Sequence, residues 1–150
     1  MDRGVVTSAD GFAAALSGIL EHTMRNVSSE MESAIRESCK VGRRAARANS
    51  RSATGTGDGT PPWRQGRALE PGQRYPKGFS YKVVRDSQTS VEGHIGNSDK
   101  PGLVHLLEKG HALSGGGRVQ GDPHLAKSAD KTFEDFEGRV HGAVQRGLEA

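Results

Sequence analysis

The stretch that decides the fold is "SADGFAAALSGILEHTMRNVSSEMESAIRESCKVGRRAARANS", residues 8–50. Its apolar residues recur mostly every three or four positions, which is the period of an α-helix. Thr7, Ser8 and Asp10 offer N-caps, and the many alanines add helix propensity. We therefore predict one long helix over residues 8–50. Its apolar positions are Phe12, Leu16, Ile19, Leu20, Val27, Met31, Ile35 and Val41.

An unbroken helix of about 40 residues would be roughly 60 Å long. That length exceeds the width of a domain built from 150 residues. The chain is also poor in apolar side chains, since 33% of its residues are hydrophobic and only 5% are aromatic. Such a chain forms a thin core by itself. We therefore expect the helix to project or to lie across a neighbouring subunit, with part of its apolar surface buried by partners.

The rest of the composition narrows the class of protein. A chain of 150 residues predicts a single domain over 1–150. The net charge of +3 and the pI near 9.2 permit contact with nucleic acid or acidic proteins but require neither. The single cysteine, Cys39, cannot form an internal disulfide, and the sequence shows no signal-peptide pattern and no membrane-length apolar run. We expect a protein made in a reducing cytoplasm, with no cofactor, no metal and no membrane partner.

A basic stripe occupies the end of the predicted helix. Two interpretations of it remain open. The cations can be solvated and balance the negative end of the helix dipole, or they can contact DNA phosphates or an acidic partner. No aromatic residue is interleaved with them, which argues against stacking on single-stranded bases. The stripe consists of Lys40, Arg43, Arg44, Arg47 and Arg51, whose spacing places them on one helical face.

Residues 51–74 are expected to form a loop, because they are rich in glycine, threonine and proline. A phosphate-binding P-loop would need Gly-Lys-Ser/Thr before a helix, and this segment lacks it. Trp63 is the only tryptophan, and it either plugs the edge of the core or anchors a partner.

Two strands are predicted in "GFSYKVVRD" (78–86) and "SVEGHIGN" (90–97), which alternate with period two. Residues 86–89 read as the loop of a hairpin. A lone hairpin is marginally stable, so it needs the helix, further strands or another subunit. Its exposed edge would be ready to pair with another chain. One face carries Phe79, Tyr81 and Val83 on the first strand and Val91, Gly93 and Ile95 on the second.

The remaining segment predicts two helices joined by a glycine-rich loop. A short helix runs from Pro101 to a stop at Gly110, and the loop covers Ser114–Gly121. Asp122 is the expected N-cap and Pro123 the first position of the last helix, which continues from about His124. Its apolar stripe is Leu125, Ala129, Phe133, Phe136, Val140 and Val144. Residues 75–150 thus form a small sheet plus a C-terminal helix, and the fold class is α+β.

The run "HLLEKGHALSGGGRVQGDPH" (105–124) raises the question of metal chemistry. Zinc-binding helices place two histidines four apart on one face, whereas His105 and His111 are six apart with Gly110 between them. A metal-dependent hydrolase using these histidines with Glu108 and His124 is a third-ranked alternative. The chain has no Gly-x-Ser-x-Gly elbow and few apolar residues to line a deep pocket, so we expect no enzyme.

The same run reads more simply as a contact module between proteins. It offers a small apolar helix, three glycines that can adopt unusual backbone shapes, and an arginine that could lie across a carboxylate or phosphate. The candidate interface residues are Leu103, His105, Leu106, Leu107, Glu108, Gly110, His111, Gly115, Gly116, Gly117 and Arg118.

This segment resembles the end of the tail-component proteins of long-tailed bacteriophages, which are neck, head–tail joining or tail-completion proteins. The family pattern is Leu-x-His-Leu-Leu-Glu-x-Gly-His, a glycine-rich stretch, Pro-His and a final helix. The earlier "RYPKGFSYKV" (74–83) is similar to the family's Thr-Gly-x-Tyr-x-x-Gly-Trp segment, with Gly72-Gln73 in place of its Thr-Gly pair. The resemblance covers about 75–140. The matching positions are Leu103, His105 to Glu108, Gly110, His111, Gly115 to Gly117, Pro123 and His124, with Tyr75, Gly78 and Phe79 upstream.

The resemblance implies an α+β structural subunit of the virion, assembled in the host bacterial cytoplasm. Copies would form a sixfold or twelvefold ring at the neck or upper tail, and viral DNA would pass through its lumen. Partners would be the adjoining head-completion or connector protein and the tail-terminator or tail-tube protein. The family brings no catalytic residues. The alternative function is a small nucleic-acid-binding protein that uses the basic stripe at 40–51.

Overall fold

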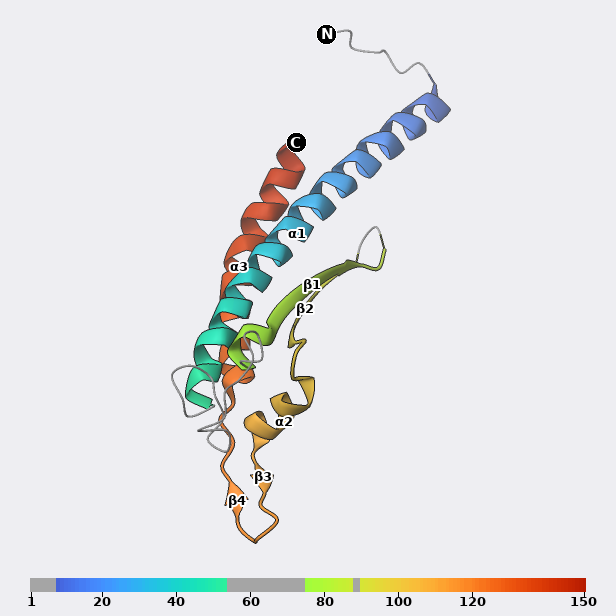
Figure 1. The fold of residues 1–150 in the computed structure, drawn as a ribbon. Helices are drawn as coiled ribbons and strands as arrows, with labels where there is room; N and C mark the ends of the chain where they lie inside the picture. Colours follow the sequence, from blue (N-terminus) through green and yellow to red (C-terminus); the bar gives the residue numbers. More distant parts are fainter. Residues whose placement is uncertain (1–7, 54–74, 88–89) are drawn as a thin grey trace.

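The structure, a computed structural model, describes residues 8–53, 75–87 and 90–150, with side chains for all of these except 51–53. Figure 1 shows two long helices side by side, a hairpin along one of them, and smaller elements gathered at one end. We call that end the base. The expected α+β class is confirmed. The elements are α1 (Ala9–Ala53), η2 (Tyr75–Gly78), β1 (Phe79–Arg85), β2 (Val91–Asn97), α2 (Pro101–Lys109), β3 (His111–Ala112), β4 (Arg118–Val119) and α3 (His124–Glu149).

The predicted long helix is confirmed as α1, with a different end. Ser8 caps its start, since the Ser8 hydroxyl accepts a hydrogen bond from the backbone N–H of Gly11 at 3.1 Å. The helix continues to Ala53 rather than stopping at 50, because the residues that follow are compatible with a helix until the glycines of the next segment. The rest of the predicted loop, including Trp63 and Gly72-Gln73, lies outside the described residues.

Small residues let α3 pack closely on α1. The backbone of Gly147 approaches Val27 so closely that an added Cβ would lie 2.5 Å from the Val27 Cα. Further along the pair, a Cβ on Gly42 would lie 2.2 Å from the Thr132 hydroxyl. Because Gly147 lies two residues before the end of α3 and meets Val27, the part of α1 that precedes this contact extends past the end of α3 and projects (Figure 1).

Polar side chains also tie the two helices together. The Ser38 hydroxyl on α1 donates to Asp135 on α3 at 2.7 Å. Arg139, one turn further along α3, orients that carboxylate with bonds of 2.7 and 3.1 Å. Nearer the C-terminus, Arg146 pairs with Glu30 at 2.7 Å. These bonds fix the register in which α3 lies along α1.

The hairpin β1–β2 has the predicted alternation. Its antiparallel register places Tyr81 opposite Ile95 and Val83 opposite Gly93, so the predicted apolar face is one continuous surface. This surface packs on α1, where a Cβ on Gly93 would meet the Cys39 sulfur at 2.5 Å. The turn runs one residue further than expected, since the Asp86 N–H donates to the Ser90 carbonyl at 3.1 Å.

Two predictions near the second glycine-rich stretch were wrong. Part of the expected loop at Ser114–Gly121 is paired, because β3 and β4 form a small antiparallel hairpin with His111 opposite Val119. Asp122 is also not the N-cap of α3: that position is taken by Pro123 without a side-chain bond, and the Asp122 carboxylate pairs with Lys127 at 2.7 Å.

Candidate functional site

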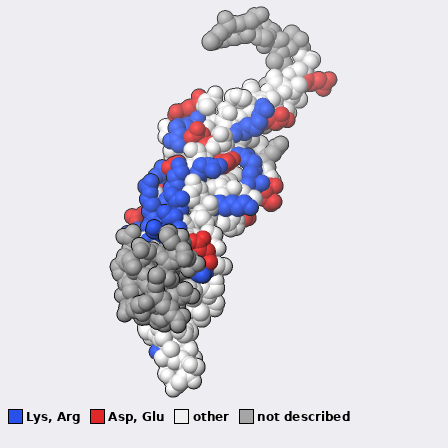
Figure 2. All heavy atoms as spheres, viewed as in Figure 1, with Lys and Arg blue, Asp and Glu red and all other residues white. Residues whose placement is uncertain are grey.

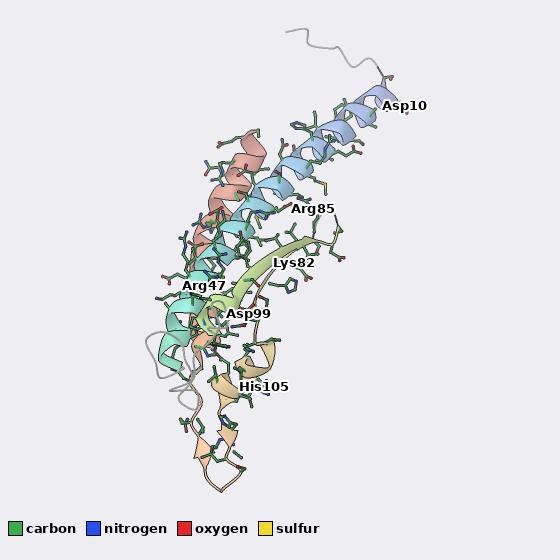
Figure 3. All side chains as sticks on the ribbon, viewed as in Figure 1. Asp10, Arg47, Lys82, Arg85, Asp99 and His105 are labelled. Carbon is green, nitrogen blue, oxygen red and sulfur yellow. The ribbon has the colours of Figure 1, made fainter. Side chains whose placement is uncertain are left out.

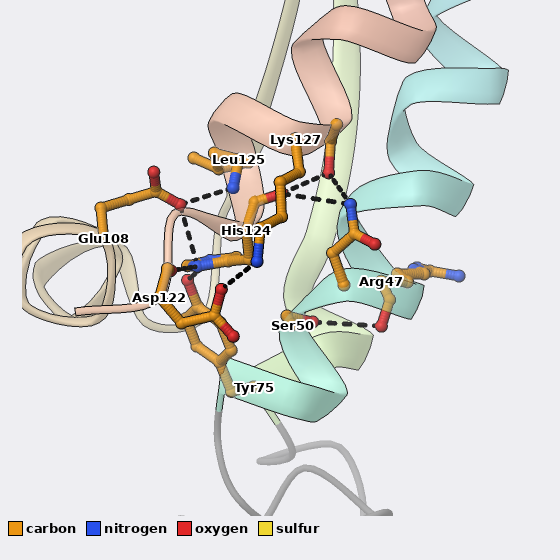
Figure 4. A network of polar contacts seen from close by, with 10 residues as sticks. Arg47, Ser50, Tyr75, Glu108, Asp122, His124, Leu125 and Lys127 are labelled. Carbon is orange, nitrogen blue, oxygen red and sulfur yellow. Dashed lines mark hydrogen bonds and ion pairs between the residues drawn. The ribbon is translucent and has the colours of Figure 1, made fainter. Parts of the chain in front are cut away.

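The most organised cluster of side chains lies at the base, where η2, α2 and the start of α3 meet (Figure 4). The rings of Tyr75, Phe79 and His124 stack edge to face, with centroids 5.3 to 6.0 Å apart. Ala46 of α1 closes the cluster from one side. We call these four residues the base core.

His124 connects three elements through its ring nitrogens. The Tyr75 hydroxyl lies 2.8 Å from Nε2, and the Glu108 carboxylate lies 2.9 Å from Nδ1. The backbone carbonyl of Asp122 also lies 3.1 Å from Nδ1. With a proton on Nδ1, this nitrogen donates to the Glu108 carboxylate and Nε2 accepts from the Tyr75 hydroxyl.

Glu108 also makes a second contact, which the sequence analysis did not predict. It accepts a hydrogen bond from the backbone N–H of Leu125, in the first turn of α3. Since Pro123 and Asp122 provide no side-chain cap, this carboxylate from α2 supplies the capping bond across the fold.

A Tyr–His–Glu chain has the connectivity of a proton relay, but its burial decides its role. Tyr75 is 2% exposed and His124 is 0% exposed. Burial, together with the charge of Glu108, raises the pKa of the Tyr75 phenol well above its usual range. Both rings are shielded from solvent, and the three side chains join η2, α2 and α3, so we call the cluster a structural joint.

The predicted interface residues divide into two groups in the structure. Leu103 and Leu107 pack against the base core, and Glu108 is engaged within it. Gly110 has a φ of 71°, and Val119 and Gly121 fill the space where a Cβ would stand, so it serves the turn into β3. These residues hold the protein's own fold together.

The second group faces outward. His105 is exposed and points away from the body (Figure 3). Gly116 and Gly117 have φ values of 89° and 92° in the turn of the β3–β4 hairpin, and Gly115 precedes them there. Arg118 is exposed and donates to the Lys109 carbonyl at 2.9 Å. Leu106 and His111 are half-buried. The interface role of this outward group stays a prediction.

The basic stripe is also divided. Arg47 donates to the backbone carbonyls of Lys77 and Phe79 at 3.1 and 2.9 Å, and Arg43 lies over the Tyr81 ring at 5.2 Å. Lys40 pairs with Glu37, which lowers the pKa of that carboxyl. Arg44 is exposed, and the Arg51 side chain lies outside the described residues. Figure 2 shows basic side chains gathered around the lower part of the helix pair.

Of the histidines and the glutamate that the metal-site alternative requires, the structure brings only some together. Glu108 and His124 meet, whereas His105 is exposed on α2. Within residues 8–53, 75–87 and 90–150, no three His, Cys, Asp or Glu side chains converge as metal ligands would. Among the described helices, none is long and apolar enough to cross a membrane.

A second feature is an apolar stripe on the projecting part of α1. These side chains are between 45% and 63% exposed, although each is large and apolar. The sequence pattern identified four of them as helix positions that need a partner, and no described segment of the chain covers them. The α1 stripe consists of Phe12, Leu16, Ile19, Leu20 and Met24.

An apolar groove continues from this stripe and was not foreseen from the sequence. It comprises adjoining hollows of about 390, 200 and 260 Å³ between α1, β2 and α3. Phe133, a predicted member of the α3 stripe, is 64% exposed at its rim instead of packing inward. The groove is lined chiefly by Ile35, Cys39, Val91, Gly93, Phe133 and Phe136.

In comparisons with known proteins, no protein-family model, no curated protein and no solved structure matches the chain.

Proposed function

We propose that the protein is a structural subunit of the neck or upper tail of a long-tailed bacteriophage, where copies of it form a ring between the DNA-filled head and the tail. The observation that carries the proposal is the α1 stripe. Soluble monomers rarely leave a large contiguous apolar patch in water, and such patches mark contact surfaces. Assembly would bury the stripe and stabilise a chain whose own core is small.

The residues behind the phage resemblance fit this role as a scaffold. Tyr75, Glu108 and His124 are positions of the resemblance, and they form the joint between η2, α2 and α3. A rigid base holds the β3–β4 hairpin and the outward face of α2 in place. In a ring, those outward parts would contact neighbouring copies or the adjoining virion proteins.

The test is assembly of the full chain, alone and with the adjoining connector protein. Electron microscopy should show closed rings, and native mass spectrometry should give a sixfold or twelvefold mass. The mass should rise further when the connector protein is added. A protein that remains a monomer and binds neither head nor tail proteins would refute the proposal.

The second candidate function is binding of duplex DNA, which the exposed Arg44 and the basic region of Figure 2 favour. Lys40→Ala with Arg44→Ala should then weaken binding and flatten its salt dependence. Arg43 and Arg47 are unsuitable for this test, because they hold β1 and η2 to α1. Binding that is unchanged in the double variant would dismiss this function.

A further inference from the structure

The α1 stripe and the groove lie end to end on one helix. The stripe extends from Phe12 to Met24, and Met24 also lines the first hollow of the groove. Because α1 is continuous from Ala9 to Ala53, the stripe cannot fold back into the groove of its own chain. The part of the stripe before Met24 therefore lies beyond the groove of its own chain, and only the groove of another molecule can receive it.

We propose that the stripe of one copy docks in the groove of the next copy, in a head-to-tail contact. This inference deepens the proposed function and rests on it, since it names the contact that would join neighbouring subunits. A head-to-tail contact uses two different surfaces on each copy, so it repeats around a ring. Every copy then donates one stripe and accepts another.

The groove is long enough to accommodate the stripe. Twelve residues separate the ends of the stripe, about 18 Å along a helix. The groove follows α1 from Met24 to Gly42, about 27 Å. An amphipathic helix can therefore lie in the groove along its whole apolar face, which is a common mode of helix recognition.

The area available is of the right order for a stable contact. A buried aromatic side chain covers roughly 150–250 Å², and the Leu, Ile and Met side chains of the stripe lie near the lower end of that range. Half exposure of the five side chains therefore leaves roughly 400 Å² of apolar surface to cover. With the flanking polar residues of the helix, this approaches the roughly 800 Å² per partner of a standard interface.

Docking in the groove also explains more than pairing of two stripes would. Two stripes packed on each other would leave the groove open and Phe133 exposed at its rim. Docking in trans covers the stripe, the hollows and this aromatic ring at once. Burial raises the pKa of the Cys39 thiol, which lines the groove. The thiol is therefore uncharged at neutral pH, and the groove stays apolar at this position.

The experiment uses two charge variants of the full chain, one on each surface. Ile19→Glu disables the stripe and Phe133→Glu disables the groove; the two side chains are 63% and 64% exposed, so neither change disturbs the fold of the monomer. Native mass spectrometry should show larger assemblies for the parent protein and a monomer for each variant alone. An equimolar mixture should give a heterodimer, because it retains one intact stripe and one intact groove.

Matched controls separate charge from position. Ala14→Glu places the same charge on the opposite side of the projecting segment, and Phe133→Leu keeps the rim apolar; both should assemble like the parent. The α-helical circular dichroism of all variants should be the same.

The inference fails if the parent chain does not self-associate, if Phe133→Glu assembles normally while Ile19→Glu does not, or if the mixture stays monomeric. Closed rings that survive both substitutions would overturn it and leave the neck proposal standing. Open chains or dimers that the two variants disrupt, without closed rings, would support the contact and count against the neck proposal.

Discussion

The phenol oxygen of Tyr75 and Nε2 of His124 lie 2.8 Å apart, although 49 residues separate them in the sequence. Both side chains are almost fully buried, and their bond joins η2 to the first residue of α3. A buried polar atom that loses its partner costs free energy, whereas a paired one stabilises modestly. The bond therefore determines which side chains meet at the base, and its net contribution to the free energy of unfolding is modest.

Replacement of Tyr75 by phenylalanine tests this joint. The ring stays in the base core, but Nε2 of His124 loses its partner, so the free energy of unfolding should fall by about 1–3 kcal/mol. Tyr81→Phe is the matched control, because its ring lies beside Arg43 and keeps that contact; it should change stability by less than about 0.5 kcal/mol. Urea denaturation measures both. Equal effects would contradict a special role for the Tyr75 hydroxyl.

Removal of the Glu108 carboxylate should loosen the start of α3. Glu108→Ala loses the bond to the Leu125 N–H and the contact with His124, and should destabilise by about 1–3 kcal/mol. Glu108→Gln retains an oxygen acceptor and should recover part of this loss. Glu134→Ala, on the exposed side of α3, should be nearly neutral. Amide hydrogen exchange at Leu125 reports the same bond locally, and unchanged protection there in Glu108→Ala would count against it.

Two glycines of α3 should respond to alanine in opposite directions. Gly147→Ala would place a methyl group against the backbone of Val27, so the helices must separate and stability should drop by about 1–3 kcal/mol. Gly138 has open space around its Cα, and Gly138→Ala should stabilise by up to about 1 kcal/mol through helix propensity. Thermal unfolding followed by circular dichroism distinguishes them. A loss of stability in both would mean that the close approach at Val27 is not the cause.

The Asp135–Arg139 pair should weaken in acid. The hydrogen bond from Arg139, with that from Ser38, lowers the pKa of Asp135 below its usual value near 3.8. A carboxyl whose pKa is lowered by folding contributes stability above its unfolded pKa and loses it as the pH falls through the folded pKa. The coupling between Asp135→Asn and Arg139→Ala should therefore be measurable at neutral pH, below about 1 kcal/mol, and should disappear as the pH falls through the lowered pKa of Asp135. A double-mutant cycle with a coupling independent of pH would refute this.

The sequence determined the helices α1, α2 and α3 and the β1–β2 hairpin through local physics. The helical period over residues 8–50, the alternation around Phe79 and Val91, and the proline and glycine that bound the short helix at 101–109 each act within a few neighbouring residues. The projection of the long helix also follows from its length against the size of the chain. These features were correct apart from the end of α1 and the turn at 86–90.

Only the tertiary structure decided which side chains meet. Local pattern assigned the cap of α3 to Asp122, but the carboxylate that reaches the helix comes from Glu108 on α2. The basic stripe shares a face by spacing, yet β1 and η2 arrive on that face and engage Arg43 and Arg47. Such contacts depend on how the segments pack, because hydrogen bonds and burial join residues that are far apart in the sequence. Periodicity reflects only neighbouring residues, so it cannot predict which distant side chains will meet.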